Sequence, residues 1–436
     1  MSAESAAGSA YLWPVRLAAG VSRGNLLTLY YAAFVSIGFI SLLNFLQPYI
    51  LIENLQIPKG EQGAVTGQLG FISELTMICL GLLIGAFSDR VGRNALFTLG
   101  LVLLAAGYAG LGSVASLPQM FGLRLLLAVG ACLAGVMLTS TQTDYPQEAD
   151  RGKLLGIAAL VTALGVTVAV VVAGQLPAMF RAQGYTAVEA GRLAMYGIAG
   201  VALASALVVR LGLIRGRPAV VRGALPLRQV IRDGLVSGRN SRIVLCYLAA
   251  FVSRSDMTVV GLYFSLWITT TGVEQGLSTA DALGKATLLF SVMNLASLVW
   301  APIMGIIIDR LERVTALTIA VGLAAVGYGS VCLVTDPINN PWFWLWLVVL
   351  GMGVISPVLA AQALLGQETQ PQLRGAVNGL FSAMGAVGIL AISLAGGYLF
   401  DLWKPYPFLV VAVMNLLLLG AAFWLTRFPG DAHVPR

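Results

Sequence analysis

Apolar residues run in long blocks along this chain, and polar residues gather in the short intervals between them. A helix needs about 20 apolar residues to cross a bilayer. Twelve blocks reach that length, centred near residues 40, 76, 105, 130, 163, 203, 255, 295, 323, 352, 386 and 416. We find no series of short alternating segments, which a membrane β-barrel would require. The pattern therefore predicts an all-α integral membrane protein with twelve transmembrane helices.

Composition and charge support a membrane protein and argue against a nucleic-acid partner. Of the 436 residues, 58% are hydrophobic and 10% are charged, whereas soluble domains carry about 25% charged residues. The net charge is +7, and with the N-terminus placed inside, 19 of the 26 Lys and Arg residues fall in inside segments. This asymmetry follows the positive-inside rule. We therefore expect a monomeric, multi-pass protein of a bacterial-type inner membrane, with the lipid bilayer as partner and both termini in the cytoplasm.

The interval between the sixth and seventh apolar blocks divides the chain into halves. It holds seven arginines and the prolines at 218 and 226, which is typical of a cytoplasmic linker. Within it, residues 227–235 are compatible with a short amphipathic helix on the inner leaflet or with an unstructured basic loop. The predicted segments are a cytoplasmic N-terminal segment at 1–24, a six-helix bundle at 25–213, the linker at 214–242, a second six-helix bundle at 243–427 and a cytoplasmic tail at 428–436.

The two predicted bundles carry matching sequences in the same order. Residues 30–36 match residues 247–253 at six of seven positions. Two further matches follow, Asp89-Arg90 with Asp309-Arg310 and Arg151-Gly152 with Arg374-Gly375, and the three offsets are 217, 220 and 223 residues. Matches that keep their order indicate an internal duplication, and parallel six-helix repeats around a midplane site are a transporter architecture. We therefore predict two pseudo-symmetric bundles.

A motif follows the second apolar block. It reads Gly85-Ala-Phe-Ser-Asp89-Arg90-Val-Gly92-Arg93, in which a glycine allows a tight turn and an aspartate can bind a helix N-terminus. The motif resembles the loop 2–3 signature G-x-x-x-D-R-x-G-R of the major facilitator superfamily, although Asn94 departs from the superfamily's second basic position. A weaker copy after the eighth block has Glu312 in place of the turn glycine.

The resemblance covers essentially the whole chain and implies a fold and a mechanism. In the fourth block, Arg124-Leu-Leu-Leu-Ala-Val-Gly130 resembles a second superfamily motif, R-x-x-Q-G-x-G. The resemblance implies a secondary transporter whose halves rock about a central cavity, with Asp89, Arg93 and Asp144 in a cytoplasmic charge cluster. The residues expected at this cytoplasmic gate are Gly85, Asp89, Arg90, Gly92, Arg93, Asp144, Arg151, Asp309, Arg310 and Arg313. The drug-antiporter motif G-x-x-x-G-P is absent from the fifth block, which makes drug efflux a weaker alternative.

Two charged residues interrupt the seventh apolar block. Arg254 and Asp256 lie near its middle, where a charge costs about 3 kcal/mol or more. Their counterparts in the first half, Ile37 and Phe39, are apolar, as expected of a site and not of a duplicated scaffold. Asp256 can carry a proton because burial favours the neutral acid, and Arg254 can hold a carboxylate or phosphate through two hydrogen bonds. About 200° separates the two around an ideal helix, so they need not pair.

Other polar residues in the spans complete the predicted binding site. Glu74 and Arg124 are candidates for proton coupling or for a structural salt bridge. The residues that can supply hydrogen bonds or aromatic walls are Asn44, Gln47, Tyr30, Tyr31, Tyr247, Tyr263, Asn294, Gln362 and Asn378. A polar residue in a membrane helix often only bonds its neighbour, and that alternative stays open for each of them.

The predicted function is proton-coupled secondary transport of a small organic anion. No ATP-binding motif G-x-x-x-x-G-K-[ST] and no H-E-x-x-H occurs, so we expect no enzyme and no cofactor, with a proton gradient as the energy source. One alternative is a divalent-metal carrier, for iron for example, using the oxygens of Asp256, Glu74 and Asn44. A drug efflux antiporter and a non-transporting sensor on the same fold are further alternatives.

Overall fold

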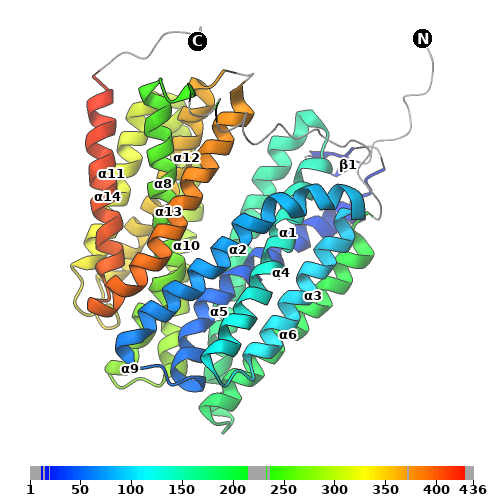
Figure 1. The fold of residues 1–436 in the computed structure, drawn as a ribbon, viewed down its shortest axis with the longest axis vertical. Helices are drawn as coiled ribbons and strands as arrows, with labels where there is room; N and C mark the ends of the chain where they lie inside the picture. Colours follow the sequence, from blue (N-terminus) through cyan, green and yellow to red (C-terminus); the bar gives the residue numbers. More distant parts are fainter. Residues whose placement is uncertain are drawn as a thin grey trace. The chain divides into compact units, whose positions relative to one another are not determined.

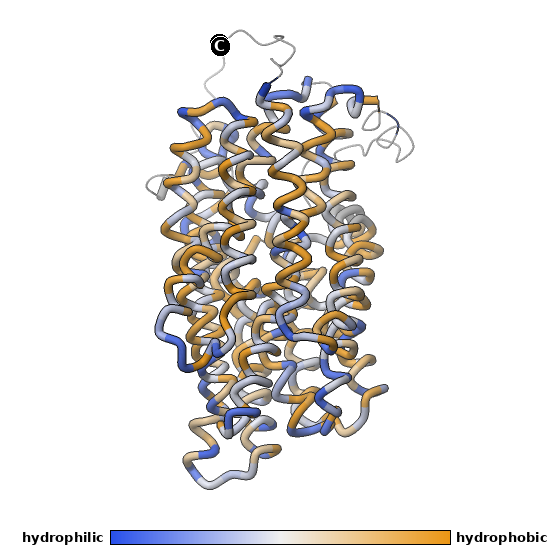
Figure 2. The backbone as a smooth tube through the Cα atoms, turned by 90° about the vertical axis from the view of Figure 1, so that its left-hand side faces the viewer, coloured by the Kyte–Doolittle hydropathy of each residue, from blue (hydrophilic) through white to orange (hydrophobic). Residues whose placement is uncertain are grey.

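The structure is a computed structural model that describes residues 11–12, 15–18, 20–214, 232, 236–370 and 373–427. Within these residues, twelve helical segments are long and apolar enough to cross a membrane, which confirms the predicted number of spans. Hydrophobic residues run along the helices, and hydrophilic residues gather towards their ends and in the connections (Figure 2). The predicted amphipathic helix at 227–235 lies outside the described residues, apart from residue 232.

The chain forms two compact units, each held together by its own helix packing. The first unit comprises residues 1–56, 72–222 and 279–284. The second unit comprises residues 57–71, 223–278 and 285–436.

The first unit is built on the packing of α1 against α5 and of α3 against α4 and α6 (Figure 1). Its elements are β1 (Tyr11–Leu12), β2 (Val15–Arg16), α1 (Arg23–Tyr49) with a π-helical continuation (Ile50–Asn54), the second half of α2 (Gln62–Val91), α3 (Arg93–Leu111), α4 (Leu117–Asp144), a 3-10 turn (Glu148–Asp150), α5 (Arg151–Ala182) and α6 (Ala187–Gly212).

Two helices of the first unit begin where the sequence provides a local signal. Ser22 caps α1, because its hydroxyl accepts from the Asn25 backbone N–H at 3.2 Å and Asn25 reciprocates. Residues 20–24 also match the serine-hydrolase pattern G-x-S-x-G, but the serine of that pattern serves the helix cap here. At α3, Gly92 precedes the first turn with φ 98°, a conformation that favours glycine and allows the tight turn expected from the loop 2–3 motif.

The N-terminal segment is pinned to the connection between α4 and α5. The two-residue strands β1 and β2 pair antiparallel, and Arg16 donates to the Asp150 carboxylate through its backbone N–H at 3.0 Å and its Nε at 2.7 Å. Lys153 contacts the same carboxylate at 2.7 Å, and the Asp150 side chain is 1% exposed. The described residues 11–12 and 15–18 are therefore held against this unit, which the sequence pattern did not predict.

The second unit is organised around α8, which packs against α12, α13 and α14, while α11 packs against α12 and α14. Its elements are a 3-10 turn (Lys59–Glu61), the first half of α2, α8 (Ser241–Val259) with a π-helical segment (Val260–Phe264), α9 (Ser265–Glu274), α10 (Thr279–Arg310), α11 (Arg313–Cys332), α12 (Phe343–Glu368), α13 (Arg374–Leu402) and α14 (Tyr406–Leu425). The π-helical segment begins four residues after Asp256, and such segments are frequent near functional sites.

Candidate functional site

Arg254 projects from α8 towards α13. A Cβ added at Gly385 of α13 would lie 2.8 Å from Arg254 Cγ, so a glycine at this position provides the room for the arginine stem. The guanidinium, on a half-buried side chain, contacts the Met257 thioether sulfur at 3.9 Å. No carboxylate among the residues that the structure describes forms an ion pair with it. A cation in a membrane span thus lies beside a thioether, with no carboxylate paired to it among the described residues.

Asp256 lies on a different side of α8 and is completely buried. Its two carboxylate oxygens accept from Asn415 Nδ2 on α14 at 2.9 and 3.0 Å. The same amide nitrogen donates to the Val411 carbonyl at 2.9 Å. Arg254 thus packs against α13, whereas Asp256 binds α14, as their angular separation allows.

Arg124 on α4 is enclosed by neutral oxygens within the first unit. It is 2% exposed and donates to Ser73 Oγ at 2.6 Å, to Gln47 Oε1 at 3.2 Å and to Asn44 Oδ1 at 2.5 Å. The half-buried Glu74 acts on it electrostatically. Four of the predicted site residues are thus brought together, but Asn44 and Gln47 serve the arginine here.

The other predicted polar and aromatic residues are distributed over several elements. Tyr31 shares a hydrogen bond with Ser205 at 2.8 Å. Tyr263 is buried, donates to the Ser393 carbonyl at 2.5 Å and stacks on Phe400. The remaining positions are a half-buried Tyr30, a buried Tyr247, a half-buried Asn294, an exposed Gln362 and an exposed Asn378, whose amide donates to the Arg374 carbonyl at 2.8 Å.

The predicted gate residues form local pairs. Arg93, at the start of α3, forms an ion pair with Asp144, at the end of α4, while the side chains of Gly85, Asp89 and Arg90 lie outside the described residues. The other contacts are Arg151 with Glu148 at 2.6 Å and Arg313 with Asp309 at 3.6 Å, and Arg310 is exposed. Of the proposed charge cluster, the Arg93–Asp144 pair is the part that the structure describes.

The second unit has a charge cluster at the same end of its repeat, which the sequence analysis did not identify. Arg242, in the first turn of α8, contacts Glu312 at 2.9 Å and Glu368 at 3.3 Å. Asn240, which precedes α8, donates to Glu368 at 3.0 Å. A signal was available, because Glu368 follows Asp144 by 224 residues, close to the offsets of the repeat. Arg242 thus ties α8 to the start of α11 and the end of α12.

Glu312 also explains the loss of the turn glycine in the weaker copy of the motif. Its carboxylate accepts from the Thr315 backbone N–H at 3.0 Å and so caps α11. We expect Glu312→Ala to lower the free energy of unfolding by about 1 kcal/mol, because a capping acceptor is lost. Thermal unfolding in detergent measures this loss of stability. Glu312→Gln is the control, because its side-chain oxygen can still accept from the Thr315 backbone N–H. An unchanged midpoint in Glu312→Ala would refute the capping role.

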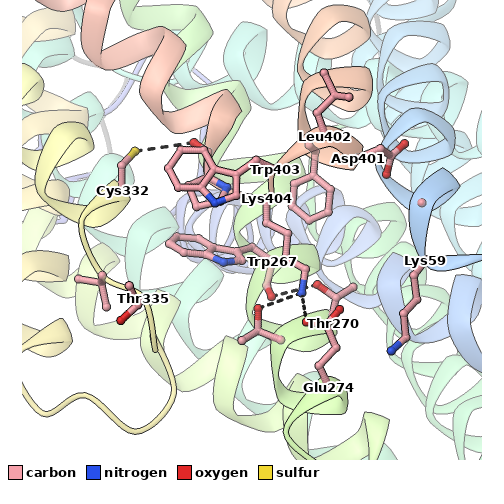
Figure 3. A pocket seen from close by; sticks show the side chains of 15 residues that line it. Lys59, Trp267, Thr270, Glu274, Cys332, Thr335, Asp401, Leu402, Trp403 and Lys404 are labelled. Atoms are coloured by element: carbon pink, nitrogen blue, oxygen red, sulfur yellow. Dashed lines mark hydrogen bonds and ion pairs between the residues drawn. The ribbon is translucent and has the colours of Figure 1, made fainter.

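A cavity of about 510 Å³ lies at the end of the second unit where α9, α11 and α13 finish. Trp267 and Trp403 line it, and Lys404 reaches across to Glu274 and Thr271 (Figure 3). Asp401, another lining residue, accepts from the backbone N–H groups of residues 63 and 64 at 2.7 Å. Lys404, Glu274 and Asp401 are engaged with the protein, and Lys59 is the fourth charged residue that lines the cavity.

The donor set for a divalent metal is incomplete in the described residues. No group of three or more His, Cys, Asp or Glu side chains gathers in that part of the chain. Of the oxygens that the metal alternative requires, Asn44 Oδ1 accepts from Arg124 and both Asp256 oxygens accept from Asn415. Hard divalent cations take about six or more oxygen ligands, so the metal alternative lacks support from this geometry.

Comparisons with known proteins give one consistent family. The sequence model described as Major Facilitator Superfamily matches residues 29–392. Magnetosome protein MamH of Paramagnetospirillum magneticum is 26% identical over 410 residues, 92% of each chain. Multidrug resistance protein MdtH of Aeromonas salmonicida is 25% identical, over 86% of this chain and 90% of the relative. The crystal structure of nucleoside transporter NupG has a TM-score of 0.72 at 13% identity, over 93% of this chain and 99% of that one, and thus shares the fold.

Proposed function

The chain belongs to the major facilitator superfamily of membrane transporters, and we propose that it carries a small organic anion held by Arg254 and coupled to protons. One observation carries the proposal. Arg254 is a cation inside a membrane span for which the described part of the chain offers a thioether and no carboxylate.

The contrast with the other arginines of the chain supports this assignment. Arg93 and Arg242 pair with carboxylates, and Arg124 is enclosed by three oxygen acceptors. Each of these arginines has a structural task that its contacts satisfy. An unsatisfied charge at this depth costs about 3 kcal/mol or more, so we infer that Arg254 is retained for a ligand.

The chemistry of the side chain selects the class of solute. A guanidinium presents a planar fork of N–H donors that matches a carboxylate or a phosphate through two parallel hydrogen bonds. The seventh span is 34 residues long and has no second basic residue near Arg254. A compact solute with one carboxylate or phosphate therefore fits better than a polyanion.

Protons are the coupling ion in this proposal, with Asp256 or Glu74 as the group that binds them. Asp256 is a buried carboxylate without an ion-pair partner among the described residues. Glu74 instead lies near the charge of Arg124. An acid without a fixed cation is the better carrier, because losing or gaining a proton breaks no ion pair.

Drug export is the second candidate, favoured by the similarity to the multidrug resistance protein MdtH over most of both chains. The fifth span argues against it, because it reads Gly156-Ile-Ala-Ala-Leu-Val-Thr-Ala-Leu-Gly165 and lacks the proline of the drug-antiporter motif.

A thermal-shift screen on the purified protein tests the proposal. The panel contains organic carboxylates, organic phosphates, divalent metals and lipophilic cations, at a pH of about 5.5 and about 7.5. We expect an organic anion to raise the unfolding temperature, and we expect Arg254→Ala to weaken its binding by about 10- to 100-fold, the value of a charged hydrogen-bonded contact. Arg23→Ala, which removes an exposed arginine at the start of α1, is the control of equal charge. Stabilisation by a metal or a lipophilic cation instead, or an anion that binds Arg254→Ala unchanged, would contradict the proposal.

A further inference from the structure

Asp256 and Asn415 are an isolated polar pair in the interior of the second unit. Both side chains are 0% exposed, and each lies near the middle of a membrane span. Asn415 Nδ2 contributes two N–H groups, one shared between the carboxylate oxygens and one donated to Val411. Placing an amide and an acid together in a span costs burial free energy on both helices, so the pair requires an explanation beyond packing.

Within the described residues, the helices around α8 place no cation beside Asp256. In the described residues, α11 has Arg313 as its one basic residue, at its start, and α13 has Arg374 at its start. The helices α12 and α14 contain no basic residue. Of the two basic residues on α8 itself, Arg242 pairs with Glu312 and Glu368 at the start of the helix, and Arg254 packs against α13. The acidic residues of the neighbours, Glu368 on α12 and Asp401 on α13, lie at the ends of their helices.

One atom of this pair and one atom of a neighbouring side chain are buried without a hydrogen bond to any described residue. Asn415 Oδ1 and the Tyr328 hydroxyl of α11 are both enclosed, and neither has a partner in the part of the chain that the structure describes. Tyr328 is close enough to Asp256 for the aspartate's charge to act on it. Buried polar atoms without partners are uncommon and indicate an alternative arrangement or a bound species.

We infer that Asp256 and Asn415 form a proton-binding pair, in which the two orientations of the Asn415 amide serve the two protonation states of the acid. In the arrangement shown, Nδ2 donates to an ionised carboxylate. When a proton binds an Asp256 oxygen, that oxygen becomes a donor, and a half-turn of the amide brings Oδ1 to accept from it. One proton is bound and released at Asp256, and no other covalent bond changes.

This inference deepens the proposed function, because it names the site and the partner of the coupling ion. It gives the two mid-span charges of α8 separate roles. Arg254, which faces α13, binds the anion, and Asp256, which faces α14, binds the proton. The binding of a proton by Asp256 does not depend on which solute is carried, so the two proposals can fail independently.

Infrared spectroscopy of the purified protein across a pH series tests the pair directly, because the carbonyl band of a protonated carboxylic acid reports neutral Asp256. We expect a band that titrates in the wild type and is absent from Asp256→Asn, a near-isosteric variant. In Asn415→Leu the ionised form loses its donor, so the band should persist to a pH higher by about one unit or more.

Controls separate this inference from the anion proposal. Arg254→Ala should abolish anion-dependent thermal stabilisation and keep the Asp256 band, whereas Asp256→Asn should do the opposite. Replacing choline chloride by sodium chloride should leave the titration unchanged. The proton pair would be overturned by a band that is identical in Asp256→Asn or by a titration that Asn415→Leu leaves unchanged. A band that sodium abolishes at constant pH would also overturn it, in favour of a sodium site.

Discussion

Gly165→Ala should prevent the first unit from reaching its folded state, or lower its free energy of unfolding by more than about 4 kcal/mol, the range in which single substitutions are exceptional. A Cβ built at Gly165 on α5 would lie 1.9 Å from the Phe34 carbonyl oxygen on α1. That atom belongs to a helix backbone and cannot rotate away, so α1 and α5 would have to separate. This helix pair is one of the principal contacts of the unit, and in membranes such close approach depends on small residues.

Gly156→Ala is the matched control on the same helix. A Cβ at Gly156 would meet nothing within 4 Å, and alanine is favoured over glycine inside a helix by about 1 kcal/mol. We therefore expect Gly156→Ala to unfold at the wild-type temperature or above it. Thermal unfolding and size-exclusion profiles in the same detergent compare the two. If Gly165→Ala behaves like Gly156→Ala, the α1–α5 packing described here is wrong.

The twelve spans were predictable because their length is set by the bilayer and not by the rest of the protein. A block such as 243–267 exceeds the about 20 apolar residues that a membrane helix needs, and neither charged residue hid it. The antiparallel pair of β1 and β2 near the N-terminus was not predictable in the same way. Its docking depends on Asp150, which is 134 residues away from Arg16, and no local pattern in residues 11–18 reports a distant carboxylate.

In the candidate site, the sequence identifies which residues are polar, but their contacts depend on residues that are distant in the sequence. The two-residue spacing of Arg254 and Asp256 correctly indicated that they need not pair. It did not indicate that Asp256 would bind Asn415, although an asparagine among the apolar residues of the twelfth span was a usable signal. For Asn44 and Gln47, the sequence identified polar residues in a span but not that Arg124, 80 and 77 residues away, would take their oxygens.

The two intramembrane arginines should respond in opposite ways to the same substitution. We expect Arg124→Leu to lower the free energy of unfolding by about 3 kcal/mol or more, because it removes three hydrogen bonds from a charged donor to Asn44, Gln47 and Ser73. It also removes the positive charge that faces Glu74. The free energy of unfolding of Arg124→Lys should lie between those of the wild type and Arg124→Leu, because lysine keeps the charge but lacks the planar guanidinium.

Arg254→Leu should leave the stability unchanged or increase it. The guanidinium has a thioether contact and no ion pair among the described residues, so the substitution strands no acceptor and removes a charge from a membrane span. Residues retained for binding at the expense of stability are expected to behave in this way. Unfolding of the three variants and the wild type in one detergent measures the contrast. A large loss of stability in Arg254→Leu would show that Arg254 holds the second unit together, and the assignment of the anion to it would then lose its basis.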